Sequence, residues 1–439
     1  MIKRNVAIIG AGGRDFHNFL VKYKDNSYYD VKFFTAAQIP GIEKRVFPRN
    51  LAGNNYNKDI PIFPEEKLPE LIKKFEIDDC VFSYSDVKHE DVMHKASICI
   101  ANGANFVLLG AKDTMIKSKK KIISVCAVRT GAGKSPVSRK VAEILKKSGK
   151  RFVAVRHPMP YGDLEREEVQ RFEKYDDFER NKCTIEEREE YEPWIEKGMV
   201  IYAGVDYNKI LKEAEKEADV IIWDGGNNDL PFFAPDLHIV VVDPHRAGHE
   251  LLYHPGEANF RMADVLLINK IDSAPKEGIR IVEENIKKTN PRAIVIKTES
   301  KLKISDAEKR IIKGKKVLIV EDGPTLTHGG MKFGAGYLVA KKYGLKIVNP
   351  KRFVVGSIKE VYEKYSHLNN VLPAMGYSEA QIKELEETIN KTPCDFVIDG
   401  TPVRLNKLLK INKPVVDVDY YIKEVGRTIE SVMKNKGFV

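Results

Sequence analysis

The chain has 439 residues, of which 43% are hydrophobic and 31% are charged, and its formal net charge is +10. This length predicts two or three domains, and the composition is that of an ordinary globular protein. No apolar run is long enough to span a bilayer, no signal peptide is recognisable, and none of the five cysteines forms a Cys-x-x-Cys pair. We therefore expect a cytoplasmic protein with no membrane partner, disulfide framework or structural zinc site.

The positive charge has two interpretations, nucleic-acid binding and a solvated ion-paired surface. Lys and Glu alternate along most predicted helices, as in residues 65–74 and 212–217, which favours the second interpretation. Aromatic and basic residues do not alternate in an RNA-binding pattern. We expect no nucleic-acid partner, whereas small anionic ligands would suit a basic protein.

Residues 1–117 are predicted to form a Rossmann-like α/β domain. Strand-like runs cover residues 5–9, 29–35, 79–83 and 105–109, and helical segments cover 65–75 and 87–102. This alternation predicts a parallel, doubly wound sheet. Gly10-Ala11-Gly12-Gly13 begins like a dinucleotide fingerprint, but Asp15 stands where the third glycine belongs. The domain either binds a nucleotide or acidic metabolite, or has a structural or oligomerising role, and a homodimer is left open.

Residues 118–302 are predicted to form a P-loop NTPase core. The apolar run 122–128 leads into Arg129-Thr130-Gly131-Ala132-Gly133-Lys134-Ser135, and an amphipathic segment from Pro136 to Lys147 follows. Strand, Gly-rich turn, Lys-Ser and helix are the context of a phosphate-binding loop. The backbone N–H groups of 130–135 and the helix N-terminus would bind a polyphosphate. We expect Lys134 to reach the terminal phosphates and Ser135 to hold Mg²⁺.

One residue of the phosphate loop departs from the usual pattern. Val128 occupies the position of the first glycine, and Arg129 follows where a subgroup of ATPases has a second lysine. A guanidinium group there could stabilise charge on the transferring phosphoryl group, in its own subunit or across a dimer. The alternatives are substrate binding and simple lining of the loop.

A phosphate loop predicts an acid that follows a second buried strand. The run 220–223 is apolar and ends at Asp224-Gly225-Gly226, which places Asp224 at the carboxyl edge of a parallel sheet. We expect Asp224 to act in catalysis and to hold Mg²⁺ together with Ser135. The two glycines could bring N–H groups close to the γ-phosphate.

A third motif, Asn269-Lys270-Ile271-Asp272, follows the strand-like run 263–268 and matches the Asn-Lys-x-Asp element of GTP-binding proteins. Asp272 would accept hydrogen bonds from a guanine edge, Lys270 would pack on the base, and Asn269 would tie this loop to the phosphate loop. ATP and GTP both remain open as the nucleotide.

Several basic residues follow other strands of the same predicted sheet and therefore project toward the same edge. These candidates for binding an acidic substrate are Arg156, His157, His245 and Arg246. The stretch 158–197 interrupts the strand pattern and is interpreted as either a functional lid or a surface insertion. Residues 303–439 are predicted to form a C-terminal α/β region. Its Gly-rich run 321–336 suggests an anion-binding nest or a mobile loop, and residues 421–434 are predicted to be helical.

Taken together, these motifs resemble one archaeal-type family of predicted GTPases, the cyclic 2,3-diphosphoglycerate synthetase-like proteins. The resemblance rests on the phosphate loop, on 156–163, 223–228, 243–246 and 269–272, and extends to residues 12–18. It implies a Mg²⁺-dependent ligase that uses a nucleoside triphosphate to close a phosphoanhydride within a small phosphorylated acid, 2,3-diphosphoglycerate.

We therefore expect a P-loop NTP-dependent synthetase that uses Mg²⁺ and either ATP or GTP. The alternatives are a GTP-hydrolysing switch with no small-molecule product and, with less support, a non-catalytic binding module. The predicted catalytic residues are Lys134, Arg129 and Asp224.

Overall fold

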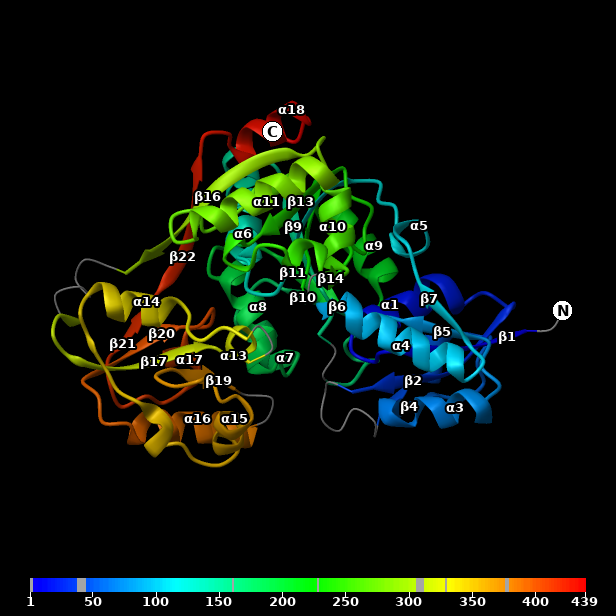
Figure 1. The fold of residues 1–439 in the computed structure, drawn as a ribbon, viewed down its shortest axis with the longest axis horizontal. Helices are drawn as coiled ribbons and strands as arrows, with labels where there is room; N and C mark the ends of the chain where they lie inside the picture. Colours follow the sequence, from blue (N-terminus) through cyan, green and yellow to red (C-terminus); the bar gives the residue numbers. More distant parts are fainter. Residues whose placement is uncertain are drawn as a thin grey trace. The chain divides into compact units, whose positions relative to one another are not determined.

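A computed structural model of the chain describes residues 3–37, 45–159, 162–226, 229–304, 312–327, 330–375 and 379–439 (Figure 1). The chain divides into two units by its internal contacts, and each is described by itself. The first unit comprises Met1–Phe172, Val200–Lys297 and Gly426–Val439, and the second comprises Glu173–Met199 and Thr298–Val425. None of the helices in the described ranges is long and apolar enough to cross a membrane.

The amino-terminal part of the first unit contains a six-stranded sheet with the order β3-β4-β2-β1-β5-β7. Its strands run parallel except for the pair β3 and β4. The strands are β1 (Arg4–Ile9), β2 (Tyr29–Ala36), β3 (Val46–Phe47), β4 (Ile60–Pro64), β5 (Asp79–Phe82) and β7 (Asn105–Leu108). The helical segments are α1 (Arg14–Asn18), η1 (Phe19–Tyr23), α2 (Arg49–Ala52), η3 (Glu65–Lys67), α3 (Leu68–Lys74), α4 (His89–Ala101) and α5 (Ala111–Thr114).

Apolar side chains cover both faces of this sheet, as the sequence pattern predicts. Leu68, Leu71 and Ile72 of α3 and Val92 of α4 pack in one buried cluster with Ala7 and Ile9 of β1, and α4 crosses in front of the sheet in Figure 1. Phe16 of α1 and Phe19 of η1 pack with Val6 and Ile8 on the other face. Alternate residues of β1 thus serve opposite faces, as expected for a buried parallel strand.

The rest of the first unit contains a larger sheet in which β10-β11-β9-β12-β8-β13-β15-β16 lie in that order. All neighbours with a described register run parallel except β10 and β11. The strands are β8 (Lys121–Ala127), β9 (Phe152–Arg156), β10 (Val169–Phe172), β11 (Ile201–Gly204), β12 (Val220–Asp224), β13 (Leu237–Val242), β15 (Val265–Ile268) and β16 (Ile294–Lys303). The helical segments are α6 (Lys134–Lys147), α9 (Tyr207–Glu217), η4 (Pro244–Arg246), η5 (His249–Leu251), α10 (Gly256–Met262), α11 (Lys276–Thr289) and α18 (Ile429–Asn435).

Helices cover this second sheet on both sides. Residues of α9, α10 and α11 pack in one buried cluster with Ile122 of β8 and Ile221 of β12. Helix α6 contacts β8, β9 and β12, and α18 packs against α6. The functional residues of a sheet buried in this way are confined to its edges and to the loops at the carboxyl ends of its strands.

A short antiparallel ribbon connects the two sheets of the first unit. Strand β6 (Val87–Lys88), which follows β5, pairs with β14 (Tyr253–His254), which follows β13 and η5. The ring of His17 in α1 also stacks on Phe232, with ring centroids 3.7 Å apart. Segments that follow β1 and β5 are therefore in direct contact with the loops that follow strands β12 and β13.

The second unit is built on strands in the order β18-β17-β20-β21, with β19 paired to β17. These strands are β17 (Lys316–Asp322), β18 (Lys346–Ile347), β19 (Leu372–Ala374), β20 (Phe396–Gly400) and β21 (Val415–Asp417), and β22 (Asp419–Val425) follows. The helical segments are α7 (Asp176–Arg180), α8 (Ile185–Ile195), α13 (Gly323–Leu326), α14 (Ala335–Lys342), η6 (Pro350–Arg352), α15 (Ile358–Lys364), α16 (Glu379–Lys391) and α17 (Leu405–Leu408).

The predicted α/β class is confirmed, with a Rossmann-like amino-terminal sheet, a P-loop parallel-sheet core and a C-terminal α/β region. The helix predicted over 421–434 is wrong for its first half. Ile422 is buried between the more exposed Tyr421 and Lys423, an alternation of period two, and these residues belong to β22. Gly426, with φ of 81°, ends the strand, and the helix begins only at Ile429.

Candidate active site

The phosphate loop has the strand, turn and helix geometry that the sequence predicts. Strand β8 ends at Ala127, α6 begins at Lys134, and Gly131 and Gly133 between them have φ of 78° and 99°. A Cβ atom at Gly133 would lie 2.2 Å from Nδ2 of Asn269. Only glycine fits here, because the loop both turns with positive φ and lies against a neighbouring loop.

The buried carboxylate of Asp224 lies at the centre of the site. Its Oδ1 accepts hydrogen bonds from Lys134 Nζ at 2.9 Å and Ser138 Oγ at 2.6 Å, and its Oδ2 accepts one from Arg156 Nη1 at 3.1 Å. Burial alone would raise the pKa of Asp224, but the charges of Lys134 and Arg156 and the hydrogen bonds lower it to about 2. Asp224 is therefore ionised at every physiological pH.

These contacts place one predicted residue beside Asp224 and add another residue to the site. Arg156, expected to bind substrate, is 4% exposed and is held by the carboxylate of Asp224 and by the backbone oxygens of Asp224 and Gly225. Ser138, one turn along α6 from Lys134, was missed by the sequence reasoning. Its spacing of four residues from Lys134 is the signal that could have found it.

The residues present fit a magnesium ion bound together with nucleotide phosphates. No group of three or more His, Cys, Asp and Glu side chains in the described ranges could hold a metal ion. Mg²⁺ commonly needs only one carboxylate, because phosphate oxygens and water supply the other ligands. Ser135 lies in the first turn of α6, and Asp224 ends β12, the strand next to β8.

The Asn-Lys-x-Asp loop contacts the phosphate loop directly. Asn269 Nδ2 donates to the backbone oxygen of Ala132 at 2.9 Å, and Lys270 Nζ donates to that of Gly131 at 2.7 Å. Lys270 Nζ also lies 2.9 Å from Oδ2 of Asp243, which ion-pairs with Arg246 at 3.1 Å. Burial would raise the pKa of Asp243, but these two cations lower it. Arg246 in turn donates to the backbone oxygen of Thr130.

The other residues of this loop lie on its exposed side. Asp272 is exposed at the end of the motif, and His245 contacts the hydroxyl of Ser273 at 2.9 Å. The structure thus places His245 beside the predicted base-reading loop, whereas Arg246 lies beside the phosphate loop. The two residues were grouped as substrate ligands in sequence reasoning, but they have different neighbours.

Arg129 extends from the phosphate loop toward the amino-terminal sheet. Its Nε donates to Asp86 Oδ1 at 2.6 Å, its Nη1 lies 2.8 Å from His249 Nδ1, and its guanidinium carbon lies 3.6 Å from the ring centre of Tyr253. The second oxygen of Asp86 accepts the backbone N–H of Thr130 at 3.2 Å. Asp86, from the amino-terminal part, thus accepts a hydrogen bond from an N–H group of the phosphate loop. Nothing in the sequence near Asp86 signals this contact.

His157 leads from this site to a second buried carboxylate. Its Nδ1 lies 2.8 Å from Oδ2 of Asp229, and both side chains are at least 95% buried. A Cβ atom at Gly226 would lie 2.8 Å from Cβ of His157, so Gly226 is needed for this close approach. Gly225, expected to offer its N–H to the γ-phosphate, instead donates it to Val125 O within the sheet.

In the described part of the Gly-rich run, backbone N–H groups bind the side chain of Glu321 from the same chain. Glu321 Oε1 accepts the N–H groups of Gly334 at 3.1 Å and Tyr337 at 2.9 Å. Burial raises the pKa of Glu321 to about 8 in spite of these bonds. His328 and Gly329, also part of the predicted nest, lie outside the described residues.

Comparisons with known proteins agree with this geometry. The family model described as CobW/HypB/UreG, nucleotide-binding domain, matches residues 214–297. The chain is 59% identical over 426 residues to the arginine synthetase ArcE of Thermococcus kodakarensis. The alignment covers 97% of this chain and 95% of that protein. It is 26% identical over 232 residues to the cyclic 2,3-diphosphoglycerate synthetase of Thermococcus sibiricus, covering 52% of this chain and 51% of that protein.

Among solved structures, LpxK from Aquifex aeolicus in complex with ATP aligns with a TM-score of 0.44 and 15% identity. The match covers 74% of this chain and 89% of that one, and so low a score supports no inference. The sequence relatives confirm a P-loop nucleotide-binding protein of synthetase type. The resemblance to cyclic 2,3-diphosphoglycerate synthetases is confirmed only as a more distant relationship over about half of the chain.

Proposed function

The chain belongs to the family that includes the arginine synthetase ArcE of Thermococcus kodakarensis, and from this premise we propose that it forms arginine at the expense of a nucleoside triphosphate. The observation that supports this most strongly is the phosphate loop with Lys134 Nζ 2.9 Å from the buried carboxylate of Asp224. A synthetase needs such a site to convert a poor leaving group into a phosphate.

The chemistry of arginine indicates the substrate. Citrulline has a ureido oxygen where arginine has a guanidino nitrogen, so one C–O bond must break and one C–N bond must form. Attack of the ureido oxygen on the γ-phosphorus would release the nucleoside diphosphate and leave an O-phosphorylated isourea. Ammonia would then attack the central carbon, the C–O bond would break, and inorganic phosphate would leave with the original ureido oxygen.

We propose the following roles for the residues. Lys134, released from Asp224, binds the β- and γ-phosphates, and the N–H groups of 130–135 bind the remaining phosphate oxygens. Asp224 and Ser135 would hold Mg²⁺, which neutralises charge on the phosphates. Arg156 fixes Asp224, and Arg129 stabilises charge on the transferred phosphoryl group. The Asn269–Asp272 loop binds the base of ATP or GTP.

The distant relationship supplies a second candidate substrate, 2,3-diphosphoglycerate. A third candidate activity is GTP hydrolysis in a switch, which the contact between the Asn-Lys-x-Asp loop and the phosphate loop favours. All three share the phosphate-loop chemistry and differ in what accepts the phosphoryl group.

One assay separates these functions. The protein is incubated with Mg²⁺ and ATP or GTP, with citrulline and ammonium, with 2,3-diphosphoglycerate, or with neither, and the products are followed by phosphorus NMR and amino-acid analysis. We expect arginine and inorganic phosphate in equal amounts. Cyclic diphosphoglycerate, or nucleotide hydrolysis indifferent to added substrate, would refute the proposal. Lys134→Ala should abolish product, and Lys140→Ala, on the same helix, should not.

A further inference from the structure

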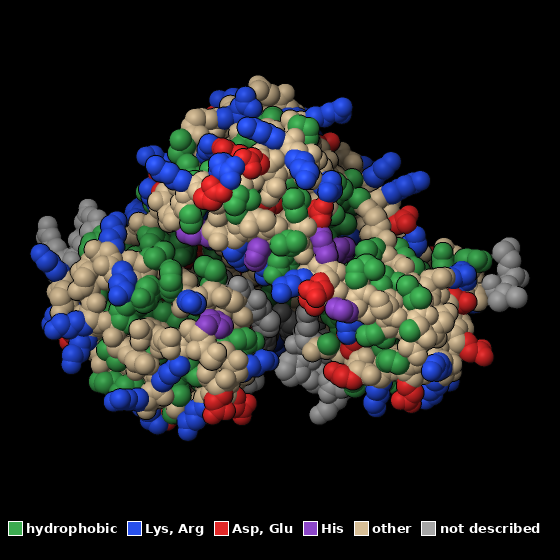
Figure 2. All heavy atoms as spheres, in the orientation of Figure 1, with side chains coloured by type: hydrophobic (Ala, Val, Ile, Leu, Met, Phe, Trp, Pro, Cys, Tyr) green, Lys and Arg blue, Asp and Glu red, His purple; other side chains and the backbone are tan. Residues whose placement is uncertain are grey.

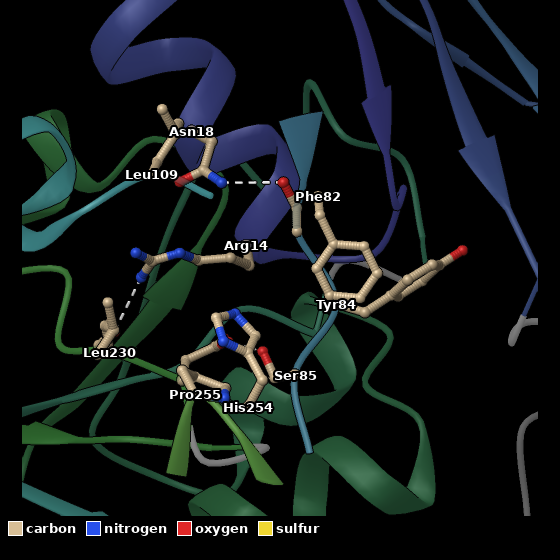
Figure 3. A pocket seen from close by; sticks show the side chains of 11 residues that line it. Arg14, Asn18, Phe82, Tyr84, Ser85, Leu109, Leu230, His254 and Pro255 are labelled. Atoms are coloured by element: carbon tan, nitrogen blue, oxygen red, sulfur yellow. Dashed lines mark hydrogen bonds between the residues drawn. The ribbon is translucent and has the colours of Figure 1, made fainter. Parts of the chain in front are cut away.

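A small pocket in the first unit lies beside the site described above. It is formed where the carboxyl end of β5 and helix α1 meet the loops that follow β12 and β14 (Figure 3). Its polar lining includes the side chains of Arg14, Asn18, Ser85, Asp229 and His254. The enclosed space has room for about one or two water molecules, so only the charged end of a small molecule, and not a whole substrate, would enter it.

Arg14 is a buried cation without a buried counter-ion in contact. It is 8% exposed, and its Nη atoms donate to the backbone oxygen of Leu230 at 2.9 Å and to Thr114 Oγ1 at 3.0 Å. Among the residues that the structure describes, no carboxylate lies within ion-pair distance of it. Burial lowers its pKa, in part offset by the charge of Asp229. A buried guanidinium with neutral partners favours an anionic ligand.

Asn18 adds an unused acceptor next to this cation. Its Nδ2 donates to Ser83 Oγ at 2.9 Å, but its Oδ1 is buried and has no hydrogen-bond partner. Asn18 lies four residues after Arg14 in α1, so the two side chains occupy one face of the helix, as Figure 3 shows. The pocket thus offers a donor cation and a neutral acceptor one helical turn apart.

The other ionisable side chains of the pocket are neutral or already in contact with neighbours. Arg14 and Asn18 are therefore the residues that would recognise a ligand. The carboxylate of Asp229 is already in contact with His157 and with the hydroxyl of Ser85. Burial lowers the pKa of His254 to about 4, so that this ring is neutral. A ligand therefore finds one cation and one free acceptor.

We propose that this pocket binds the head group of an α-amino acid, with its α-carboxylate on Arg14 and its α-ammonium on Asn18 Oδ1. The identity of the amino acid as arginine or citrulline rests on the proposed function. The pocket is linked to the phosphate loop by residues 83–86: Ser83 and Ser85 line it, and Asp86 binds Arg129 and Thr130. Residues 83–86 thus connect the proposed head-group site with the residues that contact the phosphate loop.

Ligand truncation combined with mutation tests this proposal. Binding of arginine, of agmatine, which lacks the α-carboxylate, and of Nα-acetylarginine, which lacks the α-ammonium, is measured by calorimetry. We expect the wild type to bind arginine at least about 30-fold more tightly than agmatine, as for a buried charge pair. Arg14→Met should remove this preference and Arg14→Lys should retain part of it. Asn18→Ala should reduce only the preference over Nα-acetylarginine.

The control is Arg261→Met, which removes an exposed arginine of α10 that pairs with Glu257. A wild-type preference that persists in Arg14→Met would overturn the proposal. If Arg14→Met does not fold, the same test applies to Arg14→Lys and Asn18→Ala. The proposed function is judged separately by turnover on the same preparation. If the protein shows no turnover, binding of glycine, alanine and norvaline is measured by thermal shift and still tests the head-group site. A wild type that binds no α-amino acid would refute that site.

Discussion

The ammonium nitrogen of Lys134 lies 2.9 Å from the Oδ1 atom of Asp224, and both side chains are at least 90% buried. The lysine that should bind phosphate is therefore held by the acid that should bind the metal. Arg156 also contacts Asp224, so two cations share this one buried carboxylate and the group carries an excess of positive charge. Nucleotide binding would exchange one set of charge partners for another.

The first prediction concerns this buried carboxylate. Asp224→Asn should abolish turnover, and it should destabilise the protein by about 3–5 kcal/mol because Lys134 and Arg156 are left without their counter-charge. Asp219→Asn is the matched control, since Asp219 lies beside the same strand in an exposed pair with Arg151. Chemical denaturation and phosphate release measure the two effects. Turnover near the wild-type level in Asp224→Asn would show that the acid is misassigned.

The second prediction concerns Asp86, which accepts a hydrogen bond from the N–H group of Thr130. Asp86→Asn should tighten nucleotide binding several-fold, because a negative charge beside the phosphates is removed, and should slow turnover, because Arg129 loses its anchor. Fluorescent-nucleotide titration and product assays measure the two effects separately. Asp91→Asn, in the exposed first turn of α4, serves as the control. Weaker nucleotide binding in Asp86→Asn would contradict the prediction.

The third prediction concerns reading of the base. Asp272→Ala should reduce the preference that the wild type shows between ATP and GTP, because the phosphate contacts remain and only base contacts are lost. Competition titrations with both nucleotides measure this preference, with Glu277→Ala in the exposed first turn of α11 as the control. An unchanged preference would remove Asp272 from the nucleotide site.

The fourth prediction is a pH dependence of stability in the second unit. Burial raises the pKa of Glu321 from 4.5 to about 8, so the folded state holds this proton more tightly than the unfolded state. The contribution of Glu321 is complete below pH 4.5 and is lost as the pH rises toward 8, at up to roughly 1.4 kcal/mol per pH unit. Hydrogen exchange of β17 should show this loss, and Glu321→Gln should flatten it. Glu363→Gln, at an exposed position, should leave this pH dependence unchanged. A pH dependence of stability that persists in Glu321→Gln would show that Glu321 is not its cause.

Sequence reasoning located the phosphate loop, Asp224 and the Asn269–Asp272 loop, because each follows a continuous apolar strand and is marked by local residue types. It could not identify Asp86 or Asp229, because their roles depend on which distant segments meet, and it overlooked Ser138 although that residue follows Lys134 by one helical turn. Arg156 shows the same limit, since a basic residue after a strand predicts a position at the sheet edge but not its partner. Residues 421–425 were predicted as helix because their alternation spans only a few residues before Gly426.

The net charge of +10 also illustrates what composition leaves undecided. On the face drawn in Figure 2, Lys and Arg side chains are scattered among acidic and apolar ones. The basic groups that matter for the proposed chemistry, Arg14, Lys134 and Arg156, are instead buried. A count of charged residues does not distinguish these few buried basic residues from the many basic residues on the surface.

In the proposed reaction, the ureido oxygen of citrulline is phosphorylated and leaves as phosphate. Citrulline labelled with ¹⁸O in the ureido group, incubated with the protein, Mg²⁺, nucleoside triphosphate and ammonium, tests it directly by phosphorus NMR. We expect one ¹⁸O atom in each inorganic phosphate released together with arginine. Inorganic phosphate without the label would contradict it.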